Sequence, residues 1–383
     1  MKIERLQIKN FRVFKDVELT GLSELAVFVG ANGTGKSTLF DVFAFLREAL
    51  YGDVHAALGR RGGFHEVRSR DQEGPISFEL DFGDPVAEAR TRYVVEIGER
   101  DGQAVIEHER LNHYPTPSAP PSPIFELHFG AGVAQTEPGQ PLASFELDSP
   151  EQLALKGLGL FRQLPVASRI RRHIEDWHTF DFHARSVQHV PELESAEHIS
   201  RHGENLALVA RYLYENHPDR FGALLERMKQ RIPGLTHVEA TKTVDGRVVL
   251  QFQDGAFKDP LRGSQVSSGT LTMFAYLVLM HDPSPHALLC IEEPEHHLYR
   301  TLLPELLEEL RGYSRRGAQV LVSTHAPELV DAADLSEVYW LEKRGGFSTI
   351  HHASDDEQLR ALVAEGDPAG ALWRQGLFGG IDP

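Results

Sequence analysis

Cysteine is nearly absent from the sequence, and so are long apolar runs. Cys290 is the single cysteine among 383 residues, so the chain can form neither an internal disulfide nor a metal site of several cysteines. No apolar stretch reaches the roughly 18 to 20 residues that cross a bilayer. The N-terminal MKIERLQIKNF alternates like a strand and has no apolar core of a signal peptide. These absences predict a cytoplasmic protein.

Sustained heptads and Cys-x-x-Cys pairs are also missing, so no long coiled-coil arm is expected. The net charge of −17 excludes a surface that is basic all over, but a local basic groove remains compatible with it. Basic residues concentrate in two stretches, Arg162, Arg169, Arg171 and Arg172, and Arg220, Arg227, Lys229 and Arg231. Each cluster either contacts DNA phosphates or forms a solvated helix face balanced by neighbouring acids.

The motif with the most specific chemistry lies in residues 25–50, LAVFVGANGTGKSTLFDVFAFLREAL. An apolar strand is predicted at residues 25–29 and a helix after residue 36, and the pattern G-x-x-x-x-G-K-S between them is a P-loop. Backbone N–H groups of such a loop surround phosphate oxygens. Lys36 is expected to reach the β- and γ-phosphates of ATP, and Ser37 to ligate Mg²⁺. The predicted nucleotide-binding residues are Gly30, Ala31, Asn32, Gly33, Thr34, Gly35, Lys36, Ser37 and Thr38.

A second motif, LLCIEEPEHHLY at residues 288–299, ends an apolar strand in crowded carboxylates. Such crowding costs desolvation and mutual repulsion unless positive charge lies nearby. Mg²⁺ held with a nucleotide supplies that charge, so the segment is predicted to be a Walker B strand. Glu292 then takes the metal position and Glu293 polarises the attacking water. Glu292 is one methylene longer than the usual Asp, which leaves direct and water-mediated contact with Mg²⁺ both open.

Two further segments accompany these motifs. SQVSSGTLTMF (264–274) places a Ser-x-Gly-Thr turn before a long apolar helix, and Ser267, Ser268 and Gly269 there predict a second anion site. AQVLVSTHAP (318–327) is a second apolar strand that ends at His325. Each segment is common by itself, but the four motifs follow one another in the order typical of one class of ATPase.

In that order the motifs resemble the P-loop, signature, Walker B and switch histidine of ABC-type ATPases. IERLQIKNFRVFKDVEL, GANGTGKST, VSSGTL, IEEPEHHLY and STHAPELV resemble the branch of the SMC, RecF and OLD ATPases, and most closely its prokaryotic, defence-associated AAA-type members. The resemblance implies a head-to-tail homodimer with two ATP molecules between the subunits. It also implies that His325 contacts the γ-phosphate or the attacking water. Thr270 replaces the usual signature Gln or Glu, and Gln188 is a candidate for a Q-loop glutamine that is not placed securely.

The expected fold is α/β, a P-loop NTPase of ABC-ATPase type with a mixed sheet core, an antiparallel β subdomain and an inserted helical lobe. Residues 1–150 are predicted to carry the P-loop and, from residue 76 to 148, alternating strand segments. Residues 151–263 are predicted to form the helical lobe, including FRQLPVASRIRRHIEDWHTF, with a short hairpin turning at Asp245-Gly246. Residues 264–383 are predicted to complete the ATPase core. Because about 40 residues follow SEVYWLEK, no TOPRIM nuclease domain is expected.

The function predicted from these motifs is a Mg²⁺-dependent ATPase whose ATP-sandwich dimerisation controls a DNA-linked process, phage defence or DNA repair. A separate effector protein, such as a nuclease or toxin, is the expected partner, with DNA as a further one. Two alternatives remain open. The chain could be the nucleotide-binding subunit of a membrane transporter, or a nucleotide-gated scaffold that restrains a toxin.

Overall fold

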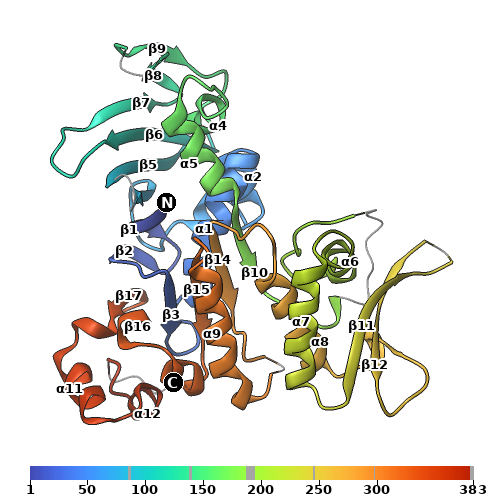
Figure 1. Cartoon of the computed structure of the whole chain (residues 1–383). Coiled ribbons are helices and arrows are strands. Elements are labelled where there is room, and N and C mark those ends of the chain that lie inside the picture. Colours follow the sequence, from blue (N-terminus) through green and yellow to red (C-terminus); the bar gives the residue numbers. More distant parts are fainter. Residues whose placement is uncertain (85–87, 138–139, 187–194, 245, 297, 380–383) are drawn as a thin grey trace.

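The molecule consists of a central sheet that joins a β-rich lobe to a lobe of helices and short strands (Figure 1). The computed structural model describes residues 1–84, 88–137, 140–186, 195–244, 246–296 and 298–379. None of the helices in these ranges is long and apolar enough to cross a membrane. The α/β class expected from the sequence is confirmed.

The β-rich lobe is an antiparallel sheet of eight strands in the order β2-β1-β4-β5-β6-β7-β8-β9. The strands are β1 (Lys2–Phe11), β2 (Phe14–Thr20), β4 (Ile76–Asp84), β5 (Ala89–Arg100), β6 (Gln103–Tyr114), β7 (Ser122–His128), β8 (Ala131–Ala134) and β9 (Ala143–Glu146). The alternating segments predicted β4, β5, β6, β7 and β9, and the structure confirms them. The short β8 has no such alternation and was not predicted. Small helices flank this lobe: α2 (Val54–Gly59), α3 (Phe64–Val67), α4 (Ala154–Leu158) and α5 (Pro165–Glu175).

The central sheet has the order β10-β14-β15-β3-β16-β17 and is parallel except for β17. Its strands are β10 (Trp177–Phe180), β14 (Leu288–Glu292), β15 (Gln319–Thr324), β3 (Leu25–Val29), β16 (Val338–Arg344) and β17 (Phe347–His352). Parallel strands end at the same edge of a sheet, which is where α/β proteins bind ligands. The loops that follow β3, β10, β14 and β15 therefore meet at one place.

The helical interpretation of residues 161–180 is wrong at its end. Helix α5 stops at Glu175, and Trp177–Phe180 forms β10, which pairs in parallel with β14. Trp177 and Phe180 are buried there. A four-residue strand has no periodicity of its own, so its pairing with a distant strand outweighs the helical pattern that precedes it.

The second lobe contains α6 (Leu206–Asn216), α7 (Pro218–Arg231) and α8 (Ser268–Met280) together with a small antiparallel sheet. The predicted hairpin is confirmed as β11 (Leu235–Lys242) and β12 (Val248–Asp254), and β13 (Leu261–Arg262) adds a third strand. Of the predicted turn, Asp245 lies outside the described residues, and Gly246 has a φ of 86°. The C-terminal part adds α9 (Leu303–Ser314), α10 (Pro327–Ala332), α11 (Glu357–Glu365) and α12 (Ala369–Arg374).

The central sheet is buried on both faces, as its uninterrupted apolar strands predict. Along β14, Leu288 and Cys290 pack into the hydrophobic core beneath the β-rich lobe and α1 (Lys36–Tyr51). Leu289 and Ile291 point the other way, into the core that contains α8. Cys290 is a small buried hydrophobe, as expected. Burial on both faces holds the carboxyl ends of the strands rigidly in place.

A buried carboxylate ties α4 to the β-rich lobe. Glu109 of β6 accepts backbone N–H groups of Ala154 at 2.5 Å and Leu155 at 3.0 Å, and the hydroxyl of Tyr93 at 2.9 Å. These donors favour the charged carboxylate, but full burial outweighs them and raises the pKa of Glu109 to about 7. Glu109 therefore retains a proton in the folded protein at a pH where an unfolded chain has lost it.

This shift predicts a pH-dependent stability. A raised acid pKa means that the folded state binds more protons, so stability falls as pH rises from the ordinary value of 4.5 to about 7. The full effect is about 3 kcal/mol. Urea unfolding across pH 4.5–8 measures it, with Glu109→Gln expected to lose this component of the slope. Identical pH slopes for parent and variant would contradict the shift.

Candidate nucleotide site

The loop between β3 and α1 has the backbone of a phosphate cradle. Gly30, Gly33 and Gly35 have φ values of 156°, 78° and 102°. A Cβ at Gly30 would lie 2.8 Å from the Leu341 carbonyl oxygen, and one at Gly35 would lie 2.7 Å from a Val13 methyl carbon. The backbone conformation and the close packing thus both require glycine. Of the other predicted residues, Ala31, Asn32, Thr34 and Thr38 lie in or directly after this loop.

Lys36 is a buried cation whose partners are backbone carbonyls. Its Nζ donates to the Gly30 oxygen at 2.8 Å and to that of Ala31 at 3.4 Å. Within the described residues, no carboxylate lies within 4.0 Å of it. Burial lowers the pKa of Lys36 to about 8, against the opposing effect of Glu293 and Glu295. A desolvated ammonium without an anionic partner is suited to bind a phosphate, so this loop fits a nucleotide.

Glu292 lies at the end of β14 and reaches Ser37. Burial raises the pKa of Glu292, a hydrogen bond from Ser37 lowers it, and the Asp181 carboxylate raises it again. Arg201 Nη2 lies 3.3 Å from Glu292 Oε1. Hydroxyl and carboxylate oxygens are the ligands that Mg²⁺ prefers, so Ser37 and Glu292 fit the predicted metal position. Arg201 therefore contacts one of the carboxylate oxygens that would coordinate such an ion.

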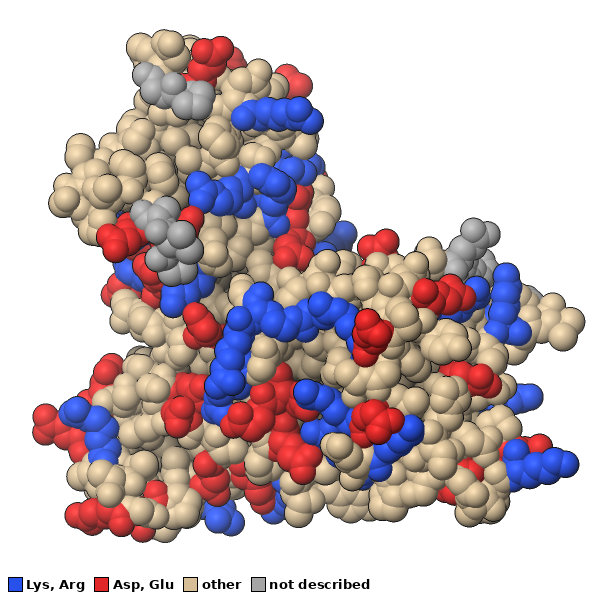
Figure 2. Space-filling view, viewed as in Figure 1, with Lys and Arg blue, Asp and Glu red and all other residues tan. Residues whose placement is uncertain are grey.

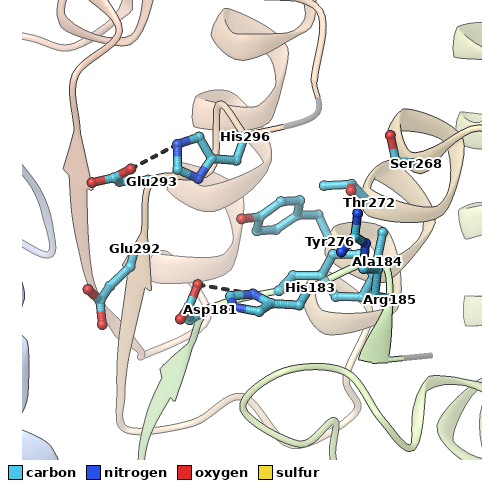
Figure 3. Close-up of a pocket in the computed structure, with 11 residues that line it drawn as sticks. Asp181, His183, Ala184, Arg185, Ser268, Thr272, Tyr276, Glu292, Glu293 and His296 are labelled. Atoms are coloured by element: carbon cyan, nitrogen blue, oxygen red, sulfur yellow. Dashed lines mark ion pairs between the residues drawn. The ribbon is translucent and has the colours of Figure 1, made fainter. Parts of the chain in front are cut away.

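Asp181 is a site residue that the sequence did not reveal. It directly follows β10, where Phe180 pairs with Ile291, so Asp181 and Glu292 lie level on neighbouring strands. Figure 3 shows both carboxylates at the same end of the cavity. Because β10 was interpreted as helix, its carboxyl end was not considered as a site. The Q-loop candidate Gln188 lies outside the described residues.

Glu293 has a strained backbone and two histidine neighbours. Its φ is 44°, which is rare for a residue with a side chain, and its N–H donates to the Ser323 oxygen at 2.9 Å. Its Oε2 lies 2.9 Å from Nε2 of His296, a contact drawn in Figure 3, and its Oε1 lies 3.5 Å from Nε2 of His325. His296 is not among the site residues predicted from the sequence. Its position three residues after Glu293 is the signal that could have identified it.

The third acid of the motif, Glu295, holds the backbone of His325, the predicted switch histidine. Its Oε1 accepts the backbone N–H of His325 at 2.6 Å. Burial raises the pKa of Glu295 and lowers that of His325, which the Lys36 charge lowers further. His325 Nε2 is buried without a hydrogen bond to any described residue. A neutral imidazole therefore faces Glu293 from the end of β15.

The predicted signature residues lie apart from the P-loop. Ser267 caps α8 by accepting the Thr270 N–H at 3.1 Å, and Ser268 and Gly269 form the first turn. A cavity of about 810 Å³ separates Ser268 from Glu293, as Figure 3 shows. No hydrogen bond joins residues 267–269 to residues 30–38 within the described ranges. The structure thus brings the predicted P-loop, Walker B and switch residues together, while the predicted signature lies across a gap.

The two basic clusters differ in how far acids neutralise them. In the second, Arg227 and Arg231 both pair with Glu309 of α9, and Lys229 pairs with Glu226. In the first, Arg169 pairs with Asp84 and Arg171 with Glu175, and no ion pair to a described residue involves Arg162 or Arg172. Figure 2 shows basic side chains in an arc above a group of acidic ones in the middle of one face. The second cluster mainly joins α7 to α9.

Comparisons with known proteins identify the family and the fold of the chain. A family profile described as "AAA domain, putative AbiEii toxin, Type IV TA system" matches residues 25–331. Among solved structures, an SMC head bound to the C-terminal winged-helix domain of ScpA is 14% identical with a TM-score of 0.56, covering 92% of this chain and 98% of that one. The SMC head of Thermotoga maritima is 15% identical with a TM-score of 0.49, covering 92% and 99%. A search of curated proteins finds no significant match.

Proposed function

Because the chain belongs to the AAA-domain family of AbiEii type, as a P-loop ATPase of the SMC/ABC-like branch, we propose that it hydrolyses ATP with Mg²⁺. We further propose that ATP closes a head-to-tail homodimer, which controls phage defence or DNA repair through a separate effector protein. One observation carries the hydrolysis proposal. Lys36, Glu292, Glu293 and His325 come from distant parts of the chain and lie together at one edge of one sheet.

In this proposal each side chain has one task. Lys36 exchanges the Gly30 carbonyl for the β- and γ-phosphate oxygens, which relieves its desolvated charge. Ser37 and Glu292 hold Mg²⁺, which neutralises charge on the phosphates. Glu293 accepts a hydrogen bond from the attacking water and then its proton. His325, held through its backbone by Glu295, contacts the γ-phosphate or the attacking water.

The gap between the signature and the P-loop supports dimerisation. Residues 267–269 begin a helix of 13 residues, whose N-terminus attracts anions, but they do not reach the P-loop of their own chain. A second copy turned head to tail would bring its signature to this P-loop. The SMC head seen with ScpA shows that the shared fold can carry a partner protein, which supports proposing an effector here.

The dimer is tested with Glu293→Gln, which traps ATP. Mg-ATP is expected to convert this variant from monomer to dimer, because each bound nucleotide adds contacts from the second subunit. Adding Ser267→Arg is expected to block dimers by filling the phosphate position, while ATP still binds the P-loop. Light scattering with and without Mg-ATP reads the mass.

The matched control adds Ser118→Arg to Glu293→Gln instead. Ser118 is exposed in the loop between β6 and β7, so this protein should dimerise like Glu293→Gln itself. A Glu293→Gln protein that stays monomeric at saturating Mg-ATP would contradict the sandwich. So would unchanged dimerisation after Ser267→Arg.

A further inference from the structure

A histidine cluster lies at the opposite end of β10 and β14 from the nucleotide site. His178 belongs to β10, His286 lies two residues before β14, and His198 comes from the segment that precedes α6. All three line a cavity of about 530 Å³. Glu292 lies six positions after His286, which corresponds to about 20 Å along a strand. The cluster is therefore separate from the residues that handle ATP.

Two carboxylates contact the histidines, and Asp176 is the one that lies outside the group of three. Asp176 Oδ1 lies 3.2 Å from His286 Nδ1, and its Oδ2 accepts the Ala287 N–H at 2.7 Å. Asp282 Oδ2 lies 2.7 Å from His198 Nδ1, and its Oδ1 accepts the Ser284 N–H at 2.8 Å. The Asp176 carboxylate on Nδ1 of His286 fixes the tautomer of that ring and leaves its Nε2 as a lone-pair donor. Metal-binding histidines are held in this way.

The free nitrogen of His286 has no partner among the residues that the structure describes. His286 is only 6% exposed, and its Nε2 makes no hydrogen bond to any described residue. His178, whose ring stacks on His286 with centroids 4.6 Å apart, also has a buried Nε2 without such a bond. Buried polar atoms are normally satisfied. Because Asp176 holds the Nδ1 of His286, the Nε2 of His286 is available as a lone-pair donor to a ligand in the cavity, and His178 places a second unsatisfied ring nitrogen beside it.

The spacing suits a single ion. One ligand atom from each of His198, Asp282 and His286 lies within 4.8 Å of the other two. Ligands of tetrahedral Zn²⁺ are about 3.4 Å apart when the bonds are about 2.1 Å long, so small side-chain shifts close the site. We propose that these three residues bind a divalent transition-metal ion of the Zn²⁺ class, with the fourth position open to the cavity beside His178.

The ligand set distinguishes this site from the nucleotide site. Two imidazoles and one carboxylate favour Zn²⁺ or Co²⁺, whereas Mg²⁺ prefers oxygen ligands throughout. A metal here joins the segment that carries His198 to the start of β14. Arg201, three residues after His198, contacts Glu292, so the ion would also restrain the residue that covers the Walker B acid.

The test is a Co²⁺ titration of the chelator-treated full chain, without nucleotide and with excess Mg²⁺ to saturate oxygen-rich sites. Visible absorption should report one Co²⁺ per chain with nitrogen ligation, and Zn²⁺ should displace it. His286→Gln and His198→Gln should each abolish the band. Asp176→Asn, which removes only the orienting carboxylate, should weaken Co²⁺ affinity about 10- to 100-fold.

His128→Gln is the matched control, because His108, Glu126 and His128 form a second group with ligand atoms within 4.8 Å, on the β-rich lobe. It should bind Co²⁺ like the parent. Circular dichroism in chelator checks that each variant is folded, and the half-exposed His198 gives a variant that disturbs little packing if His286→Gln misfolds. The proposal would be overturned if the parent showed no Co²⁺ band. It would also be overturned if His128→Gln lost the band while His286→Gln and His198→Gln kept it.

Discussion

Glu293→Gln is expected to slow Mg-ATP hydrolysis by about 10²- to 10⁴-fold, the usual contribution of a general base. The amide keeps the size of the side chain but cannot accept the proton of the attacking water. Nucleotide affinity should remain at the parental level, because Glu293 contacts His296 and His325 rather than the P-loop. Phosphate release measures turnover, and a fluorescent ATP analogue measures binding.

Glu146→Gln is the matched control for that measurement. Glu146 is an exposed acid of β9 in the β-rich lobe, so its amide variant should turn over ATP like the parent. Parental turnover by Glu293→Gln would remove Glu293 from the reaction. Loss of affinity in step with loss of turnover would instead assign it to binding.

Lys36→Ala is expected to weaken ATP binding by about 10- to 150-fold, because hydrogen bonds to charged groups contribute about 1.5–3 kcal/mol. Thermal stability without nucleotide should not fall, since the substitution removes a buried cation that has no acidic partner among the described residues. Calorimetric titration with a non-hydrolysable ATP analogue and Mg²⁺ measures the affinity.

Lys156→Ala provides a close control for the lysine. Lys156 Nζ also donates to a backbone carbonyl, that of Gly52 at 2.7 Å, but it lies in α4, outside the P-loop. Its loss should leave ATP affinity unchanged. Equal affinities for Lys36→Ala and the parent would exclude the residue 30–38 loop as the phosphate site.

The sequence pattern alone predicted the structure correctly where neighbouring residues determine the fold of a motif. The strand and the helix around Lys36 follow from their apolar runs. The loop between them follows from glycines, which the positive φ angles of its backbone require. The end of β14 follows in the same way from an apolar run that stops at carboxylates. The strands of the β-rich lobe were predicted equally well from their alternating apolar and polar residues. In each case the signal lies within a dozen neighbouring residues.

The rest depended on contacts between distant segments. Trp177–Phe180 is a strand because it pairs with the edge of β14, which lies more than 100 residues later in the chain. Its four residues show no hydrophobic periodicity from which a strand could be predicted. Asp181 was missed as a result. Arg227 and Arg231 resemble a phosphate-binding face in the sequence, but Glu309 of another helix lies against them. Sequence spacing says which residues share a helix face, not what packs on that face.

The order of the central sheet has a consequence for how the protein is made. Strand β3 is synthesised early, yet its neighbours are β15 and β16, which begin at Gln319 and Val338. The ribosome must therefore add some 300 residues before β3 gains its first partner. Pairings this distant in sequence fold slowly and leave apolar strands open to aggregation in the meantime. A nascent chain thus exposes LAVFV through most of its synthesis, and we expect it to need chaperone protection during that interval.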